Sequence, residues 1–196
     1  MSLQILGGKL KGIKLNTVDG KLVRPTSVML RRKIFDARQI LDGYSFVDFF
    51  AGSGAVGFEA LSRGAEKVFF NEMNAKVFKQ LKNNSKLIPN NSNETIINLS
   101  KMDAIKYLEI FKQIYLNYKI EQQKETILFV DPPYELHSLY IKILEAIQVS
   151  WYIGEIWIES DKHKGIAQDH PILDKFTISK VYNSSTQFVL FTKLKN

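Results

Sequence analysis

The chain has 196 residues, of which 45% are apolar and 24% charged, as in a globular protein rather than a fibrous or disordered one. It contains no cysteine, which excludes disulfides, thiolate nucleophiles and cysteine-based metal sites. No apolar run approaches the ~18 residues that a membrane span needs, and the N-terminus lacks the layout of a signal peptide. We therefore expect a cytoplasmic protein with no metal and no membrane partner, forming a single domain over residues 1–196.

The net charge of +7 is concentrated near the N-terminus. Residues 1–38 contain nine Lys or Arg and two Asp or Glu, so the charges of all later residues cancel. Four of the five arginines lie in this segment, and a guanidinium binds phosphate in a planar fork. A localised basic segment predicts a nucleic-acid partner, and the alternative is an ordinary solvated face. The basic candidates for RNA contact are Lys9, Lys11, Arg24, Arg31 and Arg32.

The predicted elements begin with a glycine-rich hairpin in residues 5–14. Thr26 or Ser27 then caps a helix that is expected to continue to about Leu41. Further along, apolar β-rich runs alternate with runs of helical period. We expect strands at 46–50, 67–71, 95–99, 126–131 and 155–160, helices at 55–63, 74–88, 104–118 and 139–149, and a final hairpin of 176–182 with 188–193. The polar segments 89–94 and 119–125 are expected to be loops.

Strands separated by helices predict an α/β protein, with a parallel sheet and helices on both of its faces. The closing hairpin adds an antiparallel strand at one edge of the sheet. In this arrangement residues 1–42 form a small basic extension of hairpin and helix, and residues 43–196 form the core. The carboxyl ends of the parallel strands are then expected to face a ligand crevice.

A glycine-rich turn joins the first core strand to its helix. Gly52, Gly54 and Gly57 match the pattern G-x-G-x-x-G, in which glycines allow positive φ and let a ligand approach the backbone. Glu72 ends the next strand, twenty residues after Gly52, where a carboxylate accepts hydrogen bonds from ribose hydroxyls. Asp103 either caps the following helix or accepts a hydrogen bond from an adenine amino group. The alternatives to a nucleotide site are a tight turn without ligand and a surface glutamate.

The residues Asp131, Pro132, Pro133 and Tyr134 follow the apolar run TILFV. The two prolines fix φ and remove two N–H donors, which leaves a carboxylate, carbonyl oxygens and an aromatic ring. This set suits a planar base with an exocyclic amine. Asp131 and the Pro132 carbonyl would accept its two hydrogens, while the ring of Tyr134 stacks on the base. Aligning the amine with an electrophilic methyl group is then the main catalytic contribution.

The sequence FVDFFAGSGAVGFEALSRGAEKVFFNE at 46–72 and DPPY at 131–134 follow GGK at 7–9 and RPT at 24–26. Together they resemble the bacterial 16S ribosomal RNA guanine-N2 methyltransferases over nearly the whole chain. The resemblance implies a class I, Rossmann-like methyltransferase fold with a seven-stranded, mostly parallel sheet. It implies S-adenosylmethionine as cofactor, 16S rRNA or the 30S subunit or its assembly intermediate as partner, and guanine 966 as target. We expect a monomer, since no long apolar stripe is evident.

The resemblance also implies a role for individual residues. Those expected to bind the cofactor are Asp48, Ala51, Gly52, Ser53, Gly54, Glu72, Met73, Asp103 and Ala104. Within this set Glu72 would bind the ribose and Met73 would pack on the adenine. Asp131 to Tyr134 would hold the target guanine, while Arg24 and Thr26 would reach the cofactor and the RNA. The helix after Thr26 departs from the usual family sequence because Arg32 replaces a glutamate.

Two other functions remain open at this stage. The same Asp-Pro-Pro-Tyr chemistry serves an adenine-N6 methyltransferase acting on DNA or RNA, although 196 residues leave no room for a DNA target-recognition domain. A non-catalytic RNA-binding factor that keeps the fold is the second alternative. The intact Asp131 and glycine turn argue against it.

Overall fold

A computed structural model describes residues 2–18, 26–89, 96–148 and 151–195 of the chain. Its main sheet has seven strands: β3 (Ser45–Asp48), β4 (Lys67–Asn71), β5 (Ile96–Ser100), β6 (Thr126–Val130), β7 (Glu155–Asp161), β8 (Phe176–Ser184) and β9 (Gln187–Leu194). The order across the sheet is β5-β4-β3-β6-β7-β9-β8. Among these strands β9 alone runs opposite to the other six, so the predicted mostly parallel sheet with one antiparallel strand is confirmed. The antiparallel strand does not lie at the edge, where it was expected, but between β7 and β8, because β8 forms the edge and β9 returns beside β7.

A separate two-stranded sheet precedes the core and consists of β1 (Ser2–Gln4) and β2 (Lys14–Asn16). The hairpin predicted within 5–14 is therefore present, but its strands lie at and beyond the ends of that segment. Residues 5–13 form the connection instead, with Gly8 and Gly12 at positive φ. Glycine is the residue that adopts this conformation at little cost, which explains a turn rather than a strand here.

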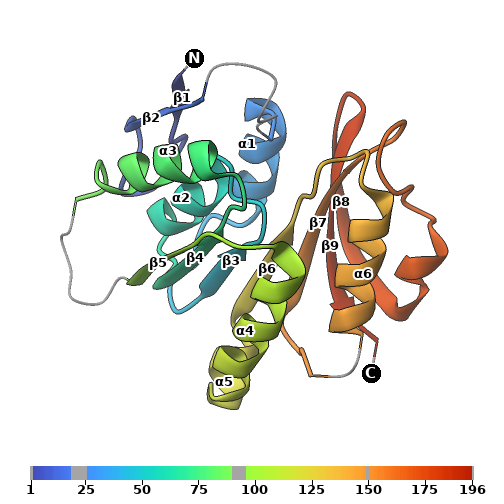
Figure 1. The fold of residues 1–196 in the computed structure, drawn as a ribbon. Helices are drawn as coiled ribbons and strands as arrows, with labels where there is room; N and C mark the ends of the chain where they lie inside the picture. Colours follow the sequence, from blue (N-terminus) through green and yellow to red (C-terminus); the bar gives the residue numbers. More distant parts are fainter. Residues whose placement is uncertain (1, 19–25, 90–95, 149–150, 196) are drawn as a thin grey trace.

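The helices are α1 (Val28–Ala37), α2 (Ala55–Ser62), α3 (Ala75–Ser85), α4 (Ala104–Leu116), α5 (Ile120–Lys124) and α6 (His137–Ile147), with a 3₁₀ turn η1 (Pro171–Lys175). They cover both faces of the sheet, as expected (Figure 1). Most of the predicted segment 89–94 lies outside the described residues.

Two helix predictions need correction. Ser27 caps α1 by accepting the N–H of Leu30 at 3.1 Å, but the helix ends at Ala37 and not near Leu41. Arg38 leaves the helical conformation, and its guanidinium donates to Glu155 at 2.5 Å. The segment 119–125 was predicted to be a loop but contains the single-turn helix α5. Its sequence has no apolar residues at helical spacing, so it gave no sign of a helix.

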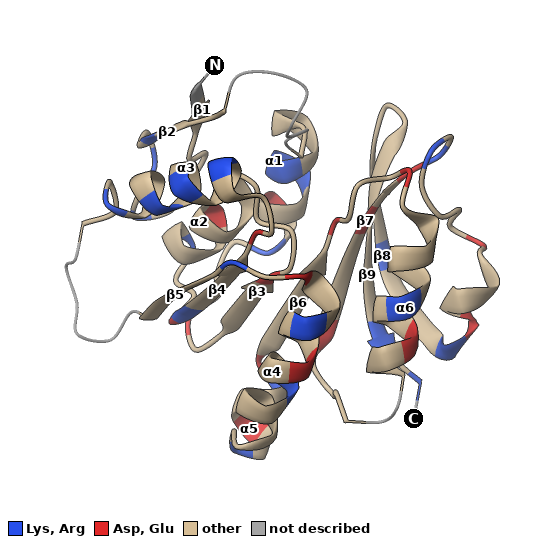
Figure 2. Ribbon diagram, viewed as in Figure 1, with Lys and Arg blue, Asp and Glu red and all other residues tan. Residues whose placement is uncertain are grey.

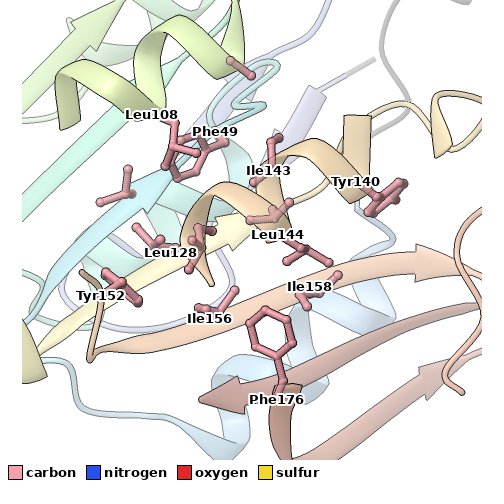
Figure 3. Close-up of a cluster of buried hydrophobic side chains, with 14 of the residues drawn as sticks. Phe49, Leu108, Leu128, Tyr140, Ile143, Leu144, Tyr152, Ile156, Ile158 and Phe176 are labelled. Carbon is pink, nitrogen blue, oxygen red and sulfur yellow. The ribbon is translucent and has the colours of Figure 1, made fainter. Parts of the chain in front are cut away.

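The inner strands β3, β4, β6 and β7 are buried on both faces because successive residues enter two separate apolar cores. On β3, Phe46 packs in the core beneath α1 and α2, whereas Val47 packs in the core beneath α4 and α6. Figure 3 shows the second core, where Leu108 of α4 and Leu144 of α6 meet the sheet residue Leu128. The two cores fix the sheet, and hence the edge at which its parallel strands end.

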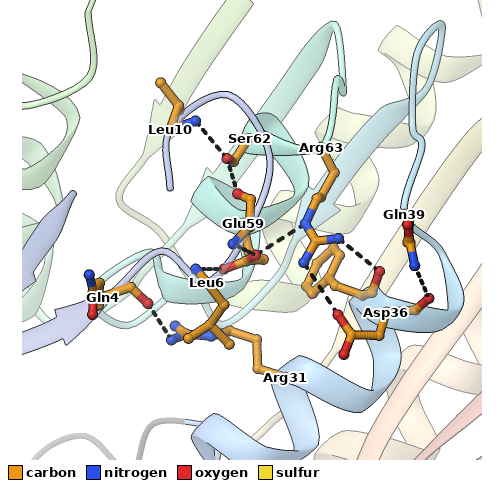
Figure 4. A network of polar contacts seen from close by, with 11 residues as sticks. Gln4, Leu6, Leu10, Arg31, Asp36, Gln39, Glu59, Ser62 and Arg63 are labelled. Carbon is orange, nitrogen blue, oxygen red and sulfur yellow. Dashed lines mark hydrogen bonds and ion pairs between the residues drawn. The ribbon is translucent and has the colours of Figure 1, made fainter. Parts of the chain in front are cut away.

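The N-terminal extension is attached to α2 through a buried carboxylate (Figure 4). Glu59 is fully buried and accepts the backbone N–H groups of Leu6 at 2.7 Å and Gly7 at 2.9 Å, as well as Nε of Arg63 at 3.3 Å. The hydroxyl of Ser62 donates to the carbonyl of Gly7 and accepts the N–H of Leu10. The GGK and EALSRGA sequences are thus the two halves of one structural junction.

The side chain of Arg31 belongs to this junction and not to the surface. It is fully buried, and its Nη2 donates to the backbone carbonyl of Gln4 at 2.7 Å. Burial lowers the pKa of this guanidinium, while the charge of Glu59 opposes that shift. An arginine enclosed in this way has no path to a phosphate, so the prediction that Arg31 contacts RNA is wrong.

Replacing Glu59 with Gln is expected to lower the free energy of unfolding by about 1–3 kcal/mol. The two carboxylate oxygens of Glu59 each accept a backbone N–H group, and in glutamine one of these oxygens becomes an NH₂ group that cannot accept. Urea unfolding followed by circular dichroism measures this change. Glu66→Gln, at an exposed glutamate, is the control and should shift stability by less than about 0.5 kcal/mol. Equal effects of the two substitutions would show that the buried junction carries no special stability.

Candidate functional site

Several of the predicted site residues meet at the carboxyl edge of the parallel strands. A small hollow there is lined by Thr26, Asp48, Phe50, Ala51, Gly52, Ser53, Ala55, Val56, Phe129 and Asp131. Residues separated by more than 100 positions in the sequence thus share one site. Because Asp48 ends β3 and Asp131 follows its neighbour β6, the parallel pairing of these strands brings the two carboxylates to the same edge.

Glycine is required at the three positions of the turn for different structural reasons. Gly52 and Gly54 have φ of +54° and +89°, which side chains rarely adopt. A Cβ atom on Gly54 would also lie 2.4 Å from the ring of Phe58. A Cβ atom on Gly57 would lie 2.2 Å from the ring of Phe70, so this glycine lets α2 approach the sheet. Gly54 and Gly57 therefore serve packing, and Gly52 borders the hollow.

Glu72 lies beside the glycine turn, as the spacing predicted. Its carboxylate accepts the N–H of Gly52 at 3.1 Å and the N–H of Asn74 at 2.7 Å. Burial raises the pKa of this carboxyl, and the hydrogen bonds from the backbone oppose the shift. Met73, beside it, is 67% exposed. Glu72 and Met73 thus place a carboxylate next to an exposed apolar side chain, a combination that suits the ribose and the adenine of a nucleoside.

Asp103 caps α4, since one of its oxygens accepts the N–H groups of Ile105 at 2.9 Å and Lys106 at 3.2 Å. The capping alternative is therefore confirmed, while contact with an adenine stays a prediction. Ala104, the next residue, is buried. Asn71, which the sequence did not single out, donates to the carbonyls of Phe49 and Met102 and so holds the turns after three strands together.

Asp48 is the most perturbed acid of the site. It is 1% exposed, and its Oδ1 has no hydrogen-bond partner. Burial, and to a lesser degree the charges of Glu72 and Glu159, raises the pKa of this carboxyl to about 7, although hydrogen bonds from the backbone oppose the shift. A buried oxygen without a donor costs free energy, so a ligand that donates a hydrogen bond or carries a positive charge would be favoured here.

The Asp131–Tyr134 segment leaves the sheet next to this hollow. Asp131 is half-buried, Pro132 is buried, and Pro133 is exposed. The carbonyl of Pro132 lies 3.3 Å from the hydroxyl of Tyr140. Tyr134 is only 4% exposed, and its hydroxyl donates to Glu159 at 3.1 Å. The expectation of an uncovered aromatic face at Tyr134 is therefore wrong for this structure, because the ring packs in the core.

Glu159 joins the two motifs, and sequence reasoning missed it. It lies on β7 with no exposed surface, and it accepts the hydroxyl of Thr26 at 2.7 Å and that of Tyr134 at 3.1 Å. Gln187 of β9 donates to it at 3.4 Å. The sequence did contain a signal, namely an acidic residue inside the apolar strand EIWIES. A charge buried in such a strand needs polar partners from elsewhere in the fold, which marks it as a candidate for a structural or functional role.

The basic residues predicted to contact RNA are distributed over separate places. Lys9 and Lys11 are exposed in the β1–β2 connection, where the N–H of Lys9 donates to the carbonyl of Ser62 at the C-terminal end of α2. They therefore lie at the opposite end of α2 from the glycine turn. Arg32 is exposed on α1, and Arg24 lies outside the described residues.

Among the described residues, no group of three or more His, Asp or Glu is placed to hold a metal ion. Within those ranges, no helix has the length and apolar character to span a bilayer.

The raised pKa of Asp48 makes the stability of the ligand-free protein depend on pH. Between about pH 5 and 7 the folded state holds a proton that the unfolded state has released, so stability falls as pH rises, by about 1.4 kcal/mol per pH unit. Asp48→Asn, which cannot ionise, should remove this contribution. Urea unfolding at several pH values measures it, and parallel pH profiles of the two proteins would contradict the assignment.

Comparison with known proteins agrees with this geometry. A protein-family model described as Conserved hypothetical protein 95 matches residues 3–190. Ribosomal RNA small subunit methyltransferase D of Haemophilus influenzae is 30% identical over 166 residues, which cover 83% of this chain and 80% of that protein. A provisionally named methyltransferase structure from Escherichia coli has a TM-score of 0.74 at 24% identity and covers 100% of this chain and 99% of that one.

A structure from Pyrococcus horikoshii, in complex with S-adenosyl-L-methionine, has a TM-score of 0.61 at 13% identity and covers 100% of this chain and 62% of that one. Both structural similarities concern the fold. The family match extends over nearly the whole chain and includes the hollow, the glycine turn and the Asp131–Tyr134 segment. The chain therefore belongs to the family described as Conserved hypothetical protein 95, that of ribosomal RNA small subunit methyltransferase D.

Proposed function

We propose that the protein is a cytoplasmic methyltransferase that uses S-adenosylmethionine to methylate the exocyclic N2 of a guanine in 16S ribosomal RNA, namely guanine 966. The observation that carries the proposal is the hollow in which the glycine turn, Asp48 and Asp131 meet. The acceptor is 16S rRNA, free or within the 30S subunit or its assembly intermediate, and the working form is a monomer.

The residues present fit this cofactor. The unpartnered Oδ1 of Asp48 suits the ammonium group of its methionine part, and Ala51, Gly52 and Ser53 line the same hollow. Glu72 suits the ribose, Met73 the face of the adenine, and Asp103 with Ala104 its edge. Gly54 holds the turn in shape. When bound, the cofactor supplies an electrophilic methyl group.

The chain's own contribution is to hold and orient the acceptor amine. The Asp131 carboxylate and the Pro132 carbonyl accept its two hydrogens, and the conformations fixed by Pro132 and Pro133 keep these oxygens in place. The amine becomes acidic only as the methyl group adds, so its proton leaves late, to Asp131 or to water. The hydroxyl of Tyr140 lies close to the Pro132 carbonyl and steadies it.

In this proposal the ring of Tyr134 stacks on the base. Because the ring is buried in the ligand-free protein, stacking requires a local rearrangement. A ring that is 4% exposed is covered by neighbouring side chains, so the entering guanine has to displace some of them. Glu159 holds the hydroxyl of Tyr134, and this keeps the ring beside Asp131 while the base enters. Thr26, bound to the same carboxylate, places the start of α1 at the acceptor side of the hollow.

Asp131→Ala is expected to lower the rate of methyl transfer to 16S rRNA about 10²–10⁴-fold, because the amine loses its main acceptor. The affinity for S-adenosylmethionine, measured by calorimetry, should stay nearly unchanged. Glu135→Ala removes an exposed carboxylate four positions further along and is the matched control. Normal turnover by purified Asp131→Ala would refute the proposed mechanism.

The positioning role of Glu159 is tested by a double-mutant cycle with Tyr134. Glu159→Gln and Tyr134→Phe each weaken the same buried hydrogen bond, and each should lower kcat about tenfold or more, with little change in cofactor affinity. If Glu159 acts through that hydroxyl, the double variant should be no slower than the slower single variant. Losses that multiply would show that the two residues act independently.

A further inference from the structure

A basic groove lies on the face of the sheet that α1 covers, away from the hollow. It is formed by the C-terminal end of α1, the start of β7 and the outer strands β8 and β9, and its volume is about 860 Å³. The residues that define it are Arg38, Lys180, Tyr182, Phe191, Lys193 and Lys195. All of them belong to the described part of the chain, and the proposed mechanism uses none of them.

The charge of this groove is assembled from both ends of the chain. Arg38 comes from the N-terminal basic segment, whereas the three lysines come from residues 175–196, which contain no Asp or Glu. Glu155 is the acidic residue lining the groove, and it is paired with Arg38 at 2.5 Å. The lysines are exposed and remain as an excess of positive charge along β8 and β9 (Figure 2). Such an excess favours a polyanionic partner.

The floor of the groove is aromatic. The ring of Phe191 stacks on Trp157 with centroids 4.1 Å apart and an angle of 6° between the rings, so this floor is rigid. Tyr182 is half-buried beside it at 4.9 Å, with Nζ of Lys180 5.8 Å from its ring. Cationic side chains around aromatic rings are typical of surfaces that bind single-stranded nucleic acid, through phosphate contacts and base stacking.

The groove is connected to the candidate site by α1. The helix starts next to Thr26, which lines the hollow, and ends at Ala37, which lines the groove. Its 10 residues span about 15 Å. Lys33, exposed on the same helix, donates to the carbonyl of Asn183 on β8 and continues the basic surface between the two. One RNA molecule can therefore reach both places.

We propose that this groove binds a single-stranded stretch of the RNA substrate about 15 Å from the target base, with Lys180 and Lys193 contacting phosphates and Tyr182 contacting a base. The proposal rests on the proposed function for the identity of the RNA. It assigns a substrate contact to the C-terminal strands, whereas the sequence placed the whole basic excess at the N-terminus.

The test is a binding measurement that does not depend on methyl transfer. A fluorescein-labelled, mixed-sequence RNA 12-mer is titrated with protein at several salt concentrations, and anisotropy gives Kd. The double variant Lys180→Glu/Lys193→Glu should raise Kd about 10–100-fold and reduce the salt slope by about 1.4, the loss of two single-strand phosphate contacts. Tyr182→Leu should raise Kd about tenfold while keeping the salt slope, because it removes stacking without changing charge.

The matched control is Lys106→Glu/Lys142→Glu, which changes net charge equally but lies on α4 and α6, over the other face of the sheet. It should change Kd less than threefold. Equal effects of the two double variants would overturn the proposal. Unchanged binding of the 12-mer combined with lost binding of 30S particles would also overturn it, in favour of a ribosomal protein as partner. RNA binding through the groove without methyl transfer would contradict only the proposed function.

Discussion

Glu159 is a fully buried carboxylate near the carboxyl end of β7, and the proposed acceptor site depends on how its hydrogen bonds are satisfied. Thr26 and Tyr134 both donate to it, so the start of α1 and the Asp-Pro-Pro-Tyr segment are tied to one strand. Removing a buried carboxylate from water is costly unless polar partners replace the lost hydration. This requirement makes the positions of two loops, more than 100 residues apart in sequence, depend on each other.

The buried carboxylate of Glu59 likewise joins distant segments, here the N-terminal extension and α2. Glu59 accepts the backbone of Leu6 and Gly7, and the nearby Arg31 holds the carbonyl of Gln4. The N-terminal extension is therefore packed as part of the core rather than added to it. Since α1 lies between the two junctions, its orientation is fixed, and its exposed face can lead from the hollow to the basic groove.

Much of the fold was predictable from sequence periodicity because parallel strands enclosed by helices are continuous apolar runs between amphipathic segments. The strand β4 and the glycine turn were placed by their residues alone. The twenty-residue spacing from Gly52 placed Glu72 at the end of β4 as a candidate ligand of the ribose, and the hydrogen bond between the two residues is seen only in the structure. The single-turn helix α5 was missed since its stability comes from local backbone bonds that leave no apolar period.

Two of the errors at the candidate site, those at Arg31 and Glu159, have one physical cause. Sequence reasoning treated charged residues as exposed, yet Arg31 is enclosed with Glu59, and Glu159 is enclosed with two hydroxyls. Pairing of this kind joins distant segments, so no local pattern reveals it. The groove has the same limit, because the lysines near the C-terminus form a basic surface only together with Arg38, which directly follows α1.

The identity of the methylated atom distinguishes guanine-N2 methylation of ribosomal RNA from every alternative function. The protein is incubated with S-adenosylmethionine labelled in the methyl group and with 30S particles, free 16S rRNA or duplex DNA. The labelled product is then digested to nucleosides. We expect N2-methylguanosine, derived from guanine 966 of the ribosomal RNA. N6-methyladenosine, labelled DNA, or no label despite intact cofactor binding would contradict this expectation.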